Sequence, residues 1–318
     1  MSGQYRIFGA EVSPYSVKVR SYFRYKQIPH EWIVRGPSSA AEYQKYAKLP
    51  IIPLVVSPEG EAMQDSTPII EQLEQRFPEP TIHPGDPVAA FVSALLEEFG
   101  DEWGNKWMFH YRWAREADQV SASERIGAAM SGASGDALKP VAAGIRERMI
   151  GRVWFVGSNA QTAPQIEKHL ATRPYLFGAR PAFGDFSMWG QIYNAWTDPT
   201  PGAILRASAP RTVAWCQRML EPKAEGPFES WSALAPTLEP LLTEQVGRRF
   251  LPWSHANAKA IADGAEEFSV DLAGETWTQK PQKYHAKSLK ALREKYAAAA
   301  SAPLDRALGE VGCLDGLR

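Results

Sequence analysis

Along the first eighty residues, segments with the apolar pattern of β-strands alternate with segments that have the apolar spacing of helices. Three short apolar runs and one shorter stretch after a Glu-Gly turn have the length of β-strands: residues 5–8, 30–34, 51–57 and 62–64. Three segments carry apolar side chains at helical spacing: residues 15–25, 39–47 and 66–76. Pro14 and Ser66 stand where helices start. The pattern therefore predicts the order β-α-β-α-β-β-α.

A proline-rich linker separates this region from a helical one. Residues 78–87, PEPTIHPGDP, contain four prolines and one glycine. Beyond them Phe99, Trp103, Trp107 and Tyr111 recur every four residues, as one stripe of a long helix does. Further helices are expected at residues 141–156, 163–173, 186–196 and 212–220, with a looser Ala-, Gly- and Ser-rich connection at 121–140.

The composition changes again after residue 221. Four prolines follow within twenty residues, and the pattern then predicts a helix at 254–266, a strand-like segment at 268–277 and a basic helix at 284–296. We expect this region to be an ordered extension that packs on the helical domain and walls the substrate site. The sequence thus predicts three parts: residues 1–78, 88–220 and 221–318.

Composition narrows the classes of function. The 318 residues carry a formal charge of −1, from 35 Lys plus Arg and 36 Asp plus Glu, so charge favours neither nucleic acid nor an anionic membrane as partner. No run of eighteen apolar residues predicts a membrane span. The first residues lack the pattern of a signal peptide, and the two cysteines form no motif. We therefore expect a cytoplasmic protein.

Three positions carry candidate chemistry. Pro53 lies in the third apolar run although it has no amide hydrogen for a sheet, so it should either begin the strand or face a non-protein partner. A cis Ile52–Pro53 bond would present the Ile52 backbone to a peptide ligand. Ser13 lies at a strand-to-helix junction, and Asp65-Ser66 begins the third helix. Helix N-termini favour negative charge, so both places suit an anion.

These motifs, in this order, resemble the cytosolic glutathione transferase superfamily, and its serine type in particular. The matching segments are Ser13-Pro14-Tyr15-Ser16, Ile52-Pro53-Leu54-Val55, Gln64-Asp65-Ser66-Thr67-Pro68, and Tyr175-Leu176-Phe177-Gly178 with Gly184-Asp185-Phe186. The resemblance covers about residues 5–220. It implies an α/β plus all-α fold, in which a thioredoxin-like N-terminal domain precedes an all-helical domain. It further implies a homodimer with glutathione as co-substrate and no metal.

The resemblance assigns roles to individual residues. Ser13 would hydrogen-bond the glutathione thiolate, with Ser16 as the competing hydroxyl. The remaining glutathione-binding residues would be Tyr15, Ile52, Pro53, Asp65 and Ser66. Lowering a thiol pKa from about 8.5 by about two units requires about 2.7 kcal/mol. One hydrogen bond to the thiolate, at about 1.5–3 kcal/mol, and one helix N-terminus, at about 0.3–1 kcal/mol, supply this.

Two positions depart from the family pattern. Ile51 stands two positions before Pro53, where the family often has a basic residue, and this bears on recognition of the glycine carboxylate. Ala182 replaces the usual Ser or Thr of a helix-capping segment, which would leave Asp185 without its reciprocal partner. A serine rather than a cysteine at position 13 excludes thiol–disulfide exchange there.

The electrophile pocket is expected between the domains, on the stripe of the first long helix. Its candidates are Phe99, Trp103, Trp107, His110 and Tyr111, for which packing in a core is the alternative. An acidic cluster lies on the same segment: Glu97, Glu98, Asp101 and Glu102. Because no His or Cys stands at matching spacing, we interpret it as a solvated face and not as a metal site.

The sequence therefore predicts a glutathione transferase that activates the thiolate for attack on a hydrophobic electrophile. Two alternatives remain open. One is a non-catalytic binding or scaffold protein with the same fold, and the other is a glutathione-dependent enzyme that cleaves aryl ethers.

Overall fold

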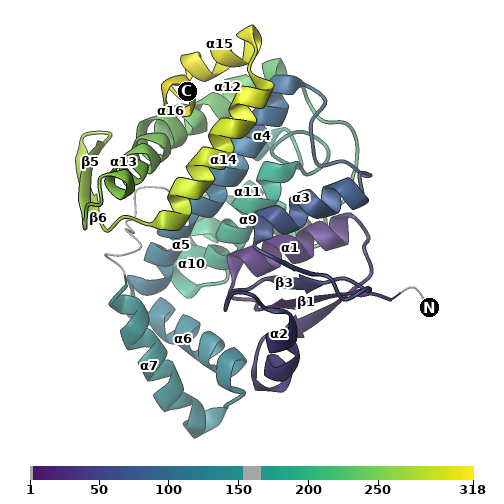
Figure 1. Cartoon of the computed structure of the whole chain (residues 1–318), viewed down its shortest axis with the longest axis vertical. Coiled ribbons are helices and arrows are strands. Elements are labelled where there is room, and N and C mark those ends of the chain that lie inside the picture. Colours follow the sequence, from purple (N-terminus) through teal and green to yellow (C-terminus); the bar gives the residue numbers. More distant parts are fainter. Residues whose placement is uncertain (1–2, 153–165) are drawn as a thin grey trace. The chain divides into compact units, whose positions relative to one another are not determined.

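The computed structural model describes residues 3–152 and 166–318 (Figure 1). Contacts group the chain into two compact units. Unit 1 comprises residues 1–82, 111–151 and 189–224, and unit 2 comprises residues 83–110, 152–188 and 225–318. Among the described residues, no helix is both long and apolar enough to cross a membrane.

A four-stranded sheet forms the centre of the N-terminal part of unit 1. Its strands are β1 (Tyr5–Gly9), β2 (His30–Val34), β3 (Leu54–Val56) and β4 (Ala62–Gln64), in the order β2-β1-β3-β4. β2 runs parallel to β1, whereas β3 is antiparallel to both β1 and β4. All four predicted strands are confirmed, and Pro53 precedes β3 as its missing amide hydrogen requires.

Helices cover both faces of this sheet. Figure 1 shows α1 (Pro14–Tyr25) and α3 (Ser66–Arg76) on one face and α2 (Ala40–Tyr46) on the other, after a short 3₁₀ turn at Pro37–Ser39. Under α2, Phe8, Leu54 and Val56 form a buried cluster with Tyr43. The N-terminal domain is therefore thioredoxin-like, and a helical domain follows it.

The remaining helices of unit 1 correct one prediction. They are α6 (Glu116–Ser131), α7 (Leu138–Ile150), α10 (Pro199–Ser208), α11 (Pro210–Arg218), the end of α5 (Asn105–Trp113) and most of α9 (Phe183–Trp196). The looser connection expected at 121–140 is wrong, because α6 continues to Ser131. Its small residues allow close packing: a Cβ on Gly127 would lie 3.0 Å from Leu138 of α7.

Unit 2 begins with the long helix that the aromatic stripe predicts. α4 (Pro87–Phe99) continues through a π-helical segment at Gly100–Gly104 into α5. Asp86 caps α4, because its Oδ1 accepts hydrogen bonds from the amides of Val88 at 2.9 Å and Ala89 at 3.1 Å. Its other oxygen accepts from the amide of Trp231 at 2.9 Å, which fixes the C-terminal region to the start of α4.

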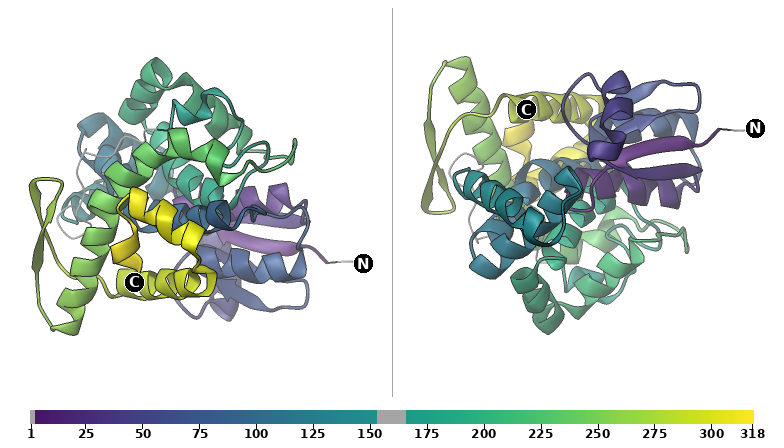
Figure 2. Two further views of the ribbon diagram at one scale, coloured as in Figure 1. Left: turned by 90° about the horizontal axis from the view of Figure 1, so that it is seen from above. Right: turned by 90° about the horizontal axis from the view of Figure 1, so that it is seen from below.

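The C-terminal region is ordered and mostly helical. Its elements are α12 (Trp231–Leu241), a π-helical segment (Leu242–Phe250), α13 (Leu251–Ala262), β5 (Phe268–Leu272), β6 (Glu275–Gln279), α14 (Lys283–Ala299), α15 (Ala302–Glu310) and α16 (Leu314–Leu317). The single strand-like segment expected at 268–277 is a hairpin, which Figures 1 and 2 show beside α13. It turns at Ala273-Gly274, where both residues have positive φ.

This region packs on α4 and completes the core of unit 2. α12, α14 and α15 all contact α4. The ring of Trp103 lies 5.6 Å from that of Trp253 and 5.3 Å from that of Trp277, measured between centroids. Residues 225–318 therefore supply one side of the core around the first long helix. Of the helix expected at 163–173, residues 166–173 are described and contain a 3₁₀ turn at His169–Ala171, while 163–165 lie outside the described residues.

Candidate functional site

The register of the sheet brings the three predicted motifs to one end of it. Phe8 pairs with Leu54, and Leu54 pairs with Gln64. Beyond this row of residues, β1 continues toward Ser13, β3 is preceded by Ile52-Pro53, and β4 is followed by Asp65-Ser66. Because β1 and β4 both run antiparallel to β3, all three segments leave the sheet at the same end.

Ser13 is the N-cap of α1. Its amide donates to the carbonyl of Ala10 at 3.0 Å, and its Oγ accepts a hydrogen bond from the amide of Ser16 at 3.3 Å. The residue is half-buried. The hydroxyl thus lies at the positive end of a helix, where a thiolate would be stabilised.

Ser16 occupies a different environment. It is fully buried, and its Oγ has no hydrogen-bond partner among the described residues. Its Cβ lies only 2.9 Å from the place that a Cβ on Gly9 would take, so Ser16 faces the first strand. A ligand can therefore reach Ser13, and the half-buried Tyr15 beside it, more readily than Ser16.

The loop before Ser13 is held by side chains from distant parts of the sequence. Glu11 accepts hydrogen bonds from Arg20 at 2.7 and 2.9 Å and from the hydroxyl of Tyr193 at 2.7 Å. Burial alone would raise the pKa of Glu11, but these donors and the charge of Arg20 lower it overall. Burial and the bond to Glu11 raise the pKa of Tyr193 to about 12, so its hydroxyl stays protonated.

A buried arginine binds the same loop. Arg112 donates to the carbonyl of Val12 at 3.0 Å and to the carboxylate of Asp198 at 2.8 Å, with side-chain exposures of 4% for Arg112 and 0% for Asp198. Arg125 also contacts Asp198. Sequence reasoning missed these residues, because local pattern gives no signal for partners separated by 86 positions.

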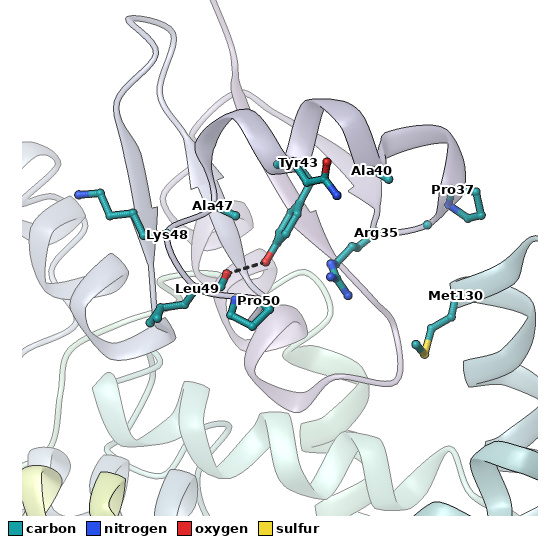
Figure 3. Close-up of a pocket in the computed structure, with 11 residues that line it drawn as sticks. Arg35, Pro37, Ala40, Tyr43, Ala47, Lys48, Leu49, Pro50 and Met130 are labelled. Atoms are coloured by element: carbon teal, nitrogen blue, oxygen red, sulfur yellow. Dashed lines mark hydrogen bonds between the residues drawn. The ribbon is translucent and has the colours of Figure 1, made fainter.

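The segment before β3 contains the predicted cis-proline. The Ile52–Pro53 bond is cis, as predicted. Within the described residues, the amide and carbonyl of Ile52 form no hydrogen bond with protein. The preceding loop is fixed, because Tyr43 donates its hydroxyl to the carbonyls of Leu49 at 3.0 Å (Figure 3) and Ile51 at 2.6 Å. The amide and carbonyl of Ile52 are therefore available for a ligand, and the loop beside them is fixed by Tyr43.

Two features at the start of α3 favour an anion, the helix N-terminus at Ser66 and the ammonium of Lys18, whereas the carboxylate of the N-cap residue opposes one. Asp65 is the N-cap of α3 and adopts a positive φ of 75°. Ser66 is buried at the first helical position, where backbone amides are unpaired by the helix. Behind it lies the buried ammonium of Lys18, 3.4 Å from the Ser66 hydroxyl and 3.1 Å from that of Thr67. Lys18 was absent from the predicted glutathione-binding residues. A lysine between apolar positions of a helix does not indicate from the sequence that its side chain is buried.

Asp185 lacks the reciprocal hydroxyl, because residue 182 is alanine, but its carboxylate still has backbone partners. Its two oxygens accept hydrogen bonds from the amides of Ala182 at 2.9 Å and Leu176 at 2.8 Å. The carboxylate thus caps α9 and at the same time fixes the Tyr175–Gly178 turn. A side chain hydroxyl at position 182 is not needed for this, since the backbone amide is the donor.

The aromatic stripe lies mainly within protein. Phe99, Trp103 and Trp107 are 2–3% exposed, whereas His110 and Tyr111 are half-buried. Phe99 packs against Phe250, with ring centroids 5.8 Å apart. Contact between the five residues of this stripe and an electrophile stays a prediction. Of the five, His110 and Tyr111 are the two that are partly exposed.

The acidic cluster is not the solvated face that its composition suggested. Glu97, Glu98, Asp101 and Glu102 are all buried. Burial, and next the charges of the neighbouring carboxylates, raise the pKa of Glu98 well above its usual value. His285 of α14 contacts Glu102, and burial lowers the pKa of that histidine. The acidic cluster is buried because the C-terminal region packs over this side of the helix.

A buried lysine lies close to the cluster. Burial lowers the pKa of Lys106 to about 7, and its ammonium lies 4.0 Å from the centre of the Trp253 ring. In the part of the chain that the structure describes, no group of three or more His, Cys, Asp or Glu side chains has the geometry to hold a metal ion.

Comparison with known proteins gives the family. The model of the glutathione S-transferase N-terminal domain matches residues 7–81, and that of the C-terminal domain matches residues 160–218. Over these two segments the chain is similar to the glutathione transferase superfamily. No curated protein matches it significantly.

Three of the solved structures to which this chain is similar are the following. A glutathione S-transferase from Methylobacterium radiotolerans, in complex with glutathione sulfonate, is 23% identical over 74% of this chain and 94% of its own, with a TM-score of 0.44. The tau-class transferase from mango is 17% identical over 76% and 100%, with a TM-score of 0.41. The beta-etherase LigF from Sphingobium sp. strain SYK-6 is 18% identical over 69% and 95%, with a TM-score of 0.45.

Proposed function

We propose that this protein is a glutathione transferase in which Ser13 hydrogen-bonds and activates the glutathione thiolate. The observation that carries the proposal is the shared end of the sheet, from which the Ser13 N-cap, the Ile52 backbone and the start of α3 all emerge. A tripeptide bound there would have its thiol at Ser13, its backbone on Ile52 and its γ-glutamyl carboxylate on Ser66, with Tyr15, Pro53 and Asp65 beside them.

The chemistry follows from the proposed position of the sulfur. A thiolate at the start of α1 receives a hydrogen bond from the Ser13 hydroxyl and the field of the helix end. Ser13 itself forms no covalent bond, since the sulfur attacks a hydrophobic electrophile. The proposal includes the predicted division into residues 1–78, 88–220 and 221–318, and a homodimer.

The test compares Ser13→Ala with Ser16→Ala. In Ser13→Ala, the bound thiol should have a pKa higher by about one to two units, and conjugation of chlorodinitrobenzene at neutral pH should fall about 10- to 100-fold. Ser16→Ala serves as the matched control and should leave the thiol pKa unchanged. Ultraviolet titration of the thiolate and steady-state rates measure both.

Two results would contradict the proposal. If calorimetry finds no glutathione binding, the non-catalytic binding or scaffold alternative replaces it. If glutathione binds but Ser13→Ala reacts at the wild-type rate, another group activates the thiol. The narrower alternative of aryl-ether cleavage is tested by assaying the wild-type protein with aryl ethers and glutathione.

A further inference from the structure

The Ser13 hydroxyl lies at the end of a tight turn between β1 and α1. The amide of Ser13 donates to the carbonyl of Ala10 at 3.0 Å, which closes a four-residue turn with Glu11 and Val12 at its centre. Because a serine side chain is short, the position of its hydroxyl follows the position of its backbone. The contacts that hold Glu11 and Val12 therefore also determine where the Ser13 hydroxyl lies.

The residue Glu11 joins this turn to two helices of unit 1. Its carboxylate accepts two hydrogen bonds from the guanidinium of Arg20 on α1, at 2.7 and 2.9 Å. The Oε1 atom of the same carboxylate also accepts a hydrogen bond from the hydroxyl of Tyr193 on α9, at 2.7 Å. The Glu11 carbonyl accepts from the side chain of Asn194, also on α9, at 3.5 Å. One residue of the turn thus connects it to helices that are far apart in the sequence.

The two side-chain donors are fixed within protein, whereas Glu11 is not. Arg20 and Tyr193 are 7% and 8% exposed. The guanidinium of Arg20 lies 4.4 Å from the centre of the Trp32 ring, and the ring of Tyr193 stacks on that of Trp189 with centroids 4.8 Å apart. The side chain of Glu11 is 50% exposed. Rigid donors that bind a partly exposed carboxylate restrain the turn more than they stabilise the fold.

This connection persists over the range of pH in which a thiol titrates. Burial alone would raise the pKa of Glu11, but the hydrogen bonds from Arg20 and Tyr193 lower it overall. Burial and the bond to Glu11 raise the pKa of Tyr193 to about 12. Between about pH 5 and about pH 9 the carboxylate therefore stays an acceptor and the hydroxyl stays a donor. A change of reaction rate with pH in this range thus reports the thiol itself.

We propose that Glu11 and Tyr193 form a positioning pair, which places the Ser13 hydroxyl at hydrogen-bonding distance from the glutathione thiol. This role rests on the proposed function, in which Ser13 is the partner of the thiolate. Neither Glu11 nor Tyr193 touches the sulfur. Tyr193 acts through Glu11, Glu11 acts through the turn, and the turn acts through Ser13. Helix α9, which lies outside the thioredoxin-like domain, thereby takes part in activating the thiol.

The charge of Glu11 and its effect on position act on the thiol in opposite directions. The carboxylate belongs to the residue two positions before Ser13, and an anion near a thiolate raises the pKa of the thiol. Loss of that charge alone would therefore lower the thiol pKa. Loss of the position of the turn would raise it, since Ser13 would no longer donate to the sulfur. A raised thiol pKa in a variant without the carboxylate is thus evidence of positioning.

Ultraviolet titration of bound glutathione and conjugation of chlorodinitrobenzene test this in Tyr193→Phe and Glu11→Ala. In Tyr193→Phe, the thiol pKa should rise by about 0.5–1 unit, and the rate at about pH 6.5 should fall about 3- to 10-fold. Glutathione affinity should change by less than about twofold, since no binding contact is lost. Glu11→Ala should raise the thiol pKa despite the lost charge. Glu11→Gln, whose amide oxygen still accepts from Tyr193, should react faster than Glu11→Ala.

The matched control is Tyr22→Phe. The buried hydroxyl of Tyr22 on α1 also donates to a carboxylate, that of Glu74, at 2.7 Å, but this pair lies toward the other end of the helix from Ser13. Its loss should lower stability and leave the thiol pKa unchanged. Thermal unfolding of every variant separates loss of the fold from loss of position, because a smaller folded fraction lowers the rate without shifting its dependence on pH.

A double variant tests whether Tyr193 acts through Ser13. When Tyr193→Phe is added to Ser13→Ala, the rate should stay that of Ser13→Ala, because the group that Tyr193 positions is already absent. Two results would overturn the positioning role and leave the proposed function standing: additive losses in the double variant, or a wild-type thiol pKa in Tyr193→Phe while Ser13→Ala raises it. A wild-type rate in Ser13→Ala would overturn both.

Discussion

The buried ammonium of Lys18 on α1 donates a hydrogen bond to the hydroxyl of Ser66, the first residue of α3, over 3.4 Å. Lys18 is 1% exposed, so its charge acts in a medium that screens it weakly. A cation behind a helix N-terminus adds to the field of the helix dipole. In the proposed complex, this pair lies beside the γ-glutamyl carboxylate of glutathione.

Replacing Lys18 by methionine should weaken glutathione binding about 10-fold. Methionine fills a similar volume but removes the charge and the donor behind Ser66. Calorimetry measures the affinity, and the rate at saturating glutathione should change much less than the affinity, because Lys18 lies away from the sulfur in the proposed complex.

The control for this change is Lys26→Met. Lys26 lies at the other end of α1, is also buried, and contacts Glu74 and the carbonyl of Phe77 at 2.7 Å. It should lower stability without lowering glutathione affinity. Equal affinity losses in both variants would show that the Lys18 effect is one of stability alone.

Arg112 and Arg125 share Asp198 but should differ in their contribution to stability. Arg112→Met removes the buried partner and the hydrogen bond to Val12, so the free energy of unfolding should fall by about 3–5 kcal/mol. Arg125, whose side chain is 33% exposed, should contribute about 1 kcal/mol or less. Urea unfolding compares them, and similar losses would contradict the role given to burial.

Two helical glycines should respond to alanine with opposite signs. In α9, a Cβ on Gly190 would lie 2.6 Å from the carbonyl of Pro14, so Gly190→Ala must displace the start of α1 and should destabilise by about 1–3 kcal/mol. In α7, a Cβ on Gly144 meets nothing within 4 Å, so Gly144→Ala should stabilise by about 0.5–1 kcal/mol.

Thermal unfolding measures both glycine variants. Gly190→Ala should also slow conjugation, because Pro14 follows the proposed thiolate partner. A stabilising Gly190→Ala would show that α9 does not press on the start of α1.

His169 should make stability depend on pH below neutrality. Burial, and to a lesser extent the charge of Arg173, lower its pKa from 6.5 to about 4. The unfolded chain therefore binds more protons than the folded chain between these values, so stability falls as the pH falls from about 6.5 to about 4. The shift corresponds to about 3 kcal/mol.

Urea unfolding between pH 7 and pH 4 tests this with His169→Gln. The variant should lose about 3 kcal/mol less than the wild type over that interval, whatever its stability at pH 7. Identical pH profiles for the wild type and His169→Gln would refute the assignment.

Much of the N-terminal domain is determined by local sequence. Strand and helix periods, Pro14 and Ser66 at helix starts, and Pro53 before a strand all specify structure through steric and hydrogen-bonding rules that act over a few residues. These rules located the four strands and three main helices, and they placed Ser13 at the junction between the first strand and the first helix.

The tertiary structure determines which groups each side chain contacts and how deeply it is buried. No local pattern indicates that Lys18 is buried behind Ser66, that Arg112 holds the loop before Ser13, or that the C-terminal region covers the acidic cluster. Local pattern specifies the elements because backbone preferences are short-ranged. Burial and partners depend on contacts between distant segments, and these form only when the chain folds.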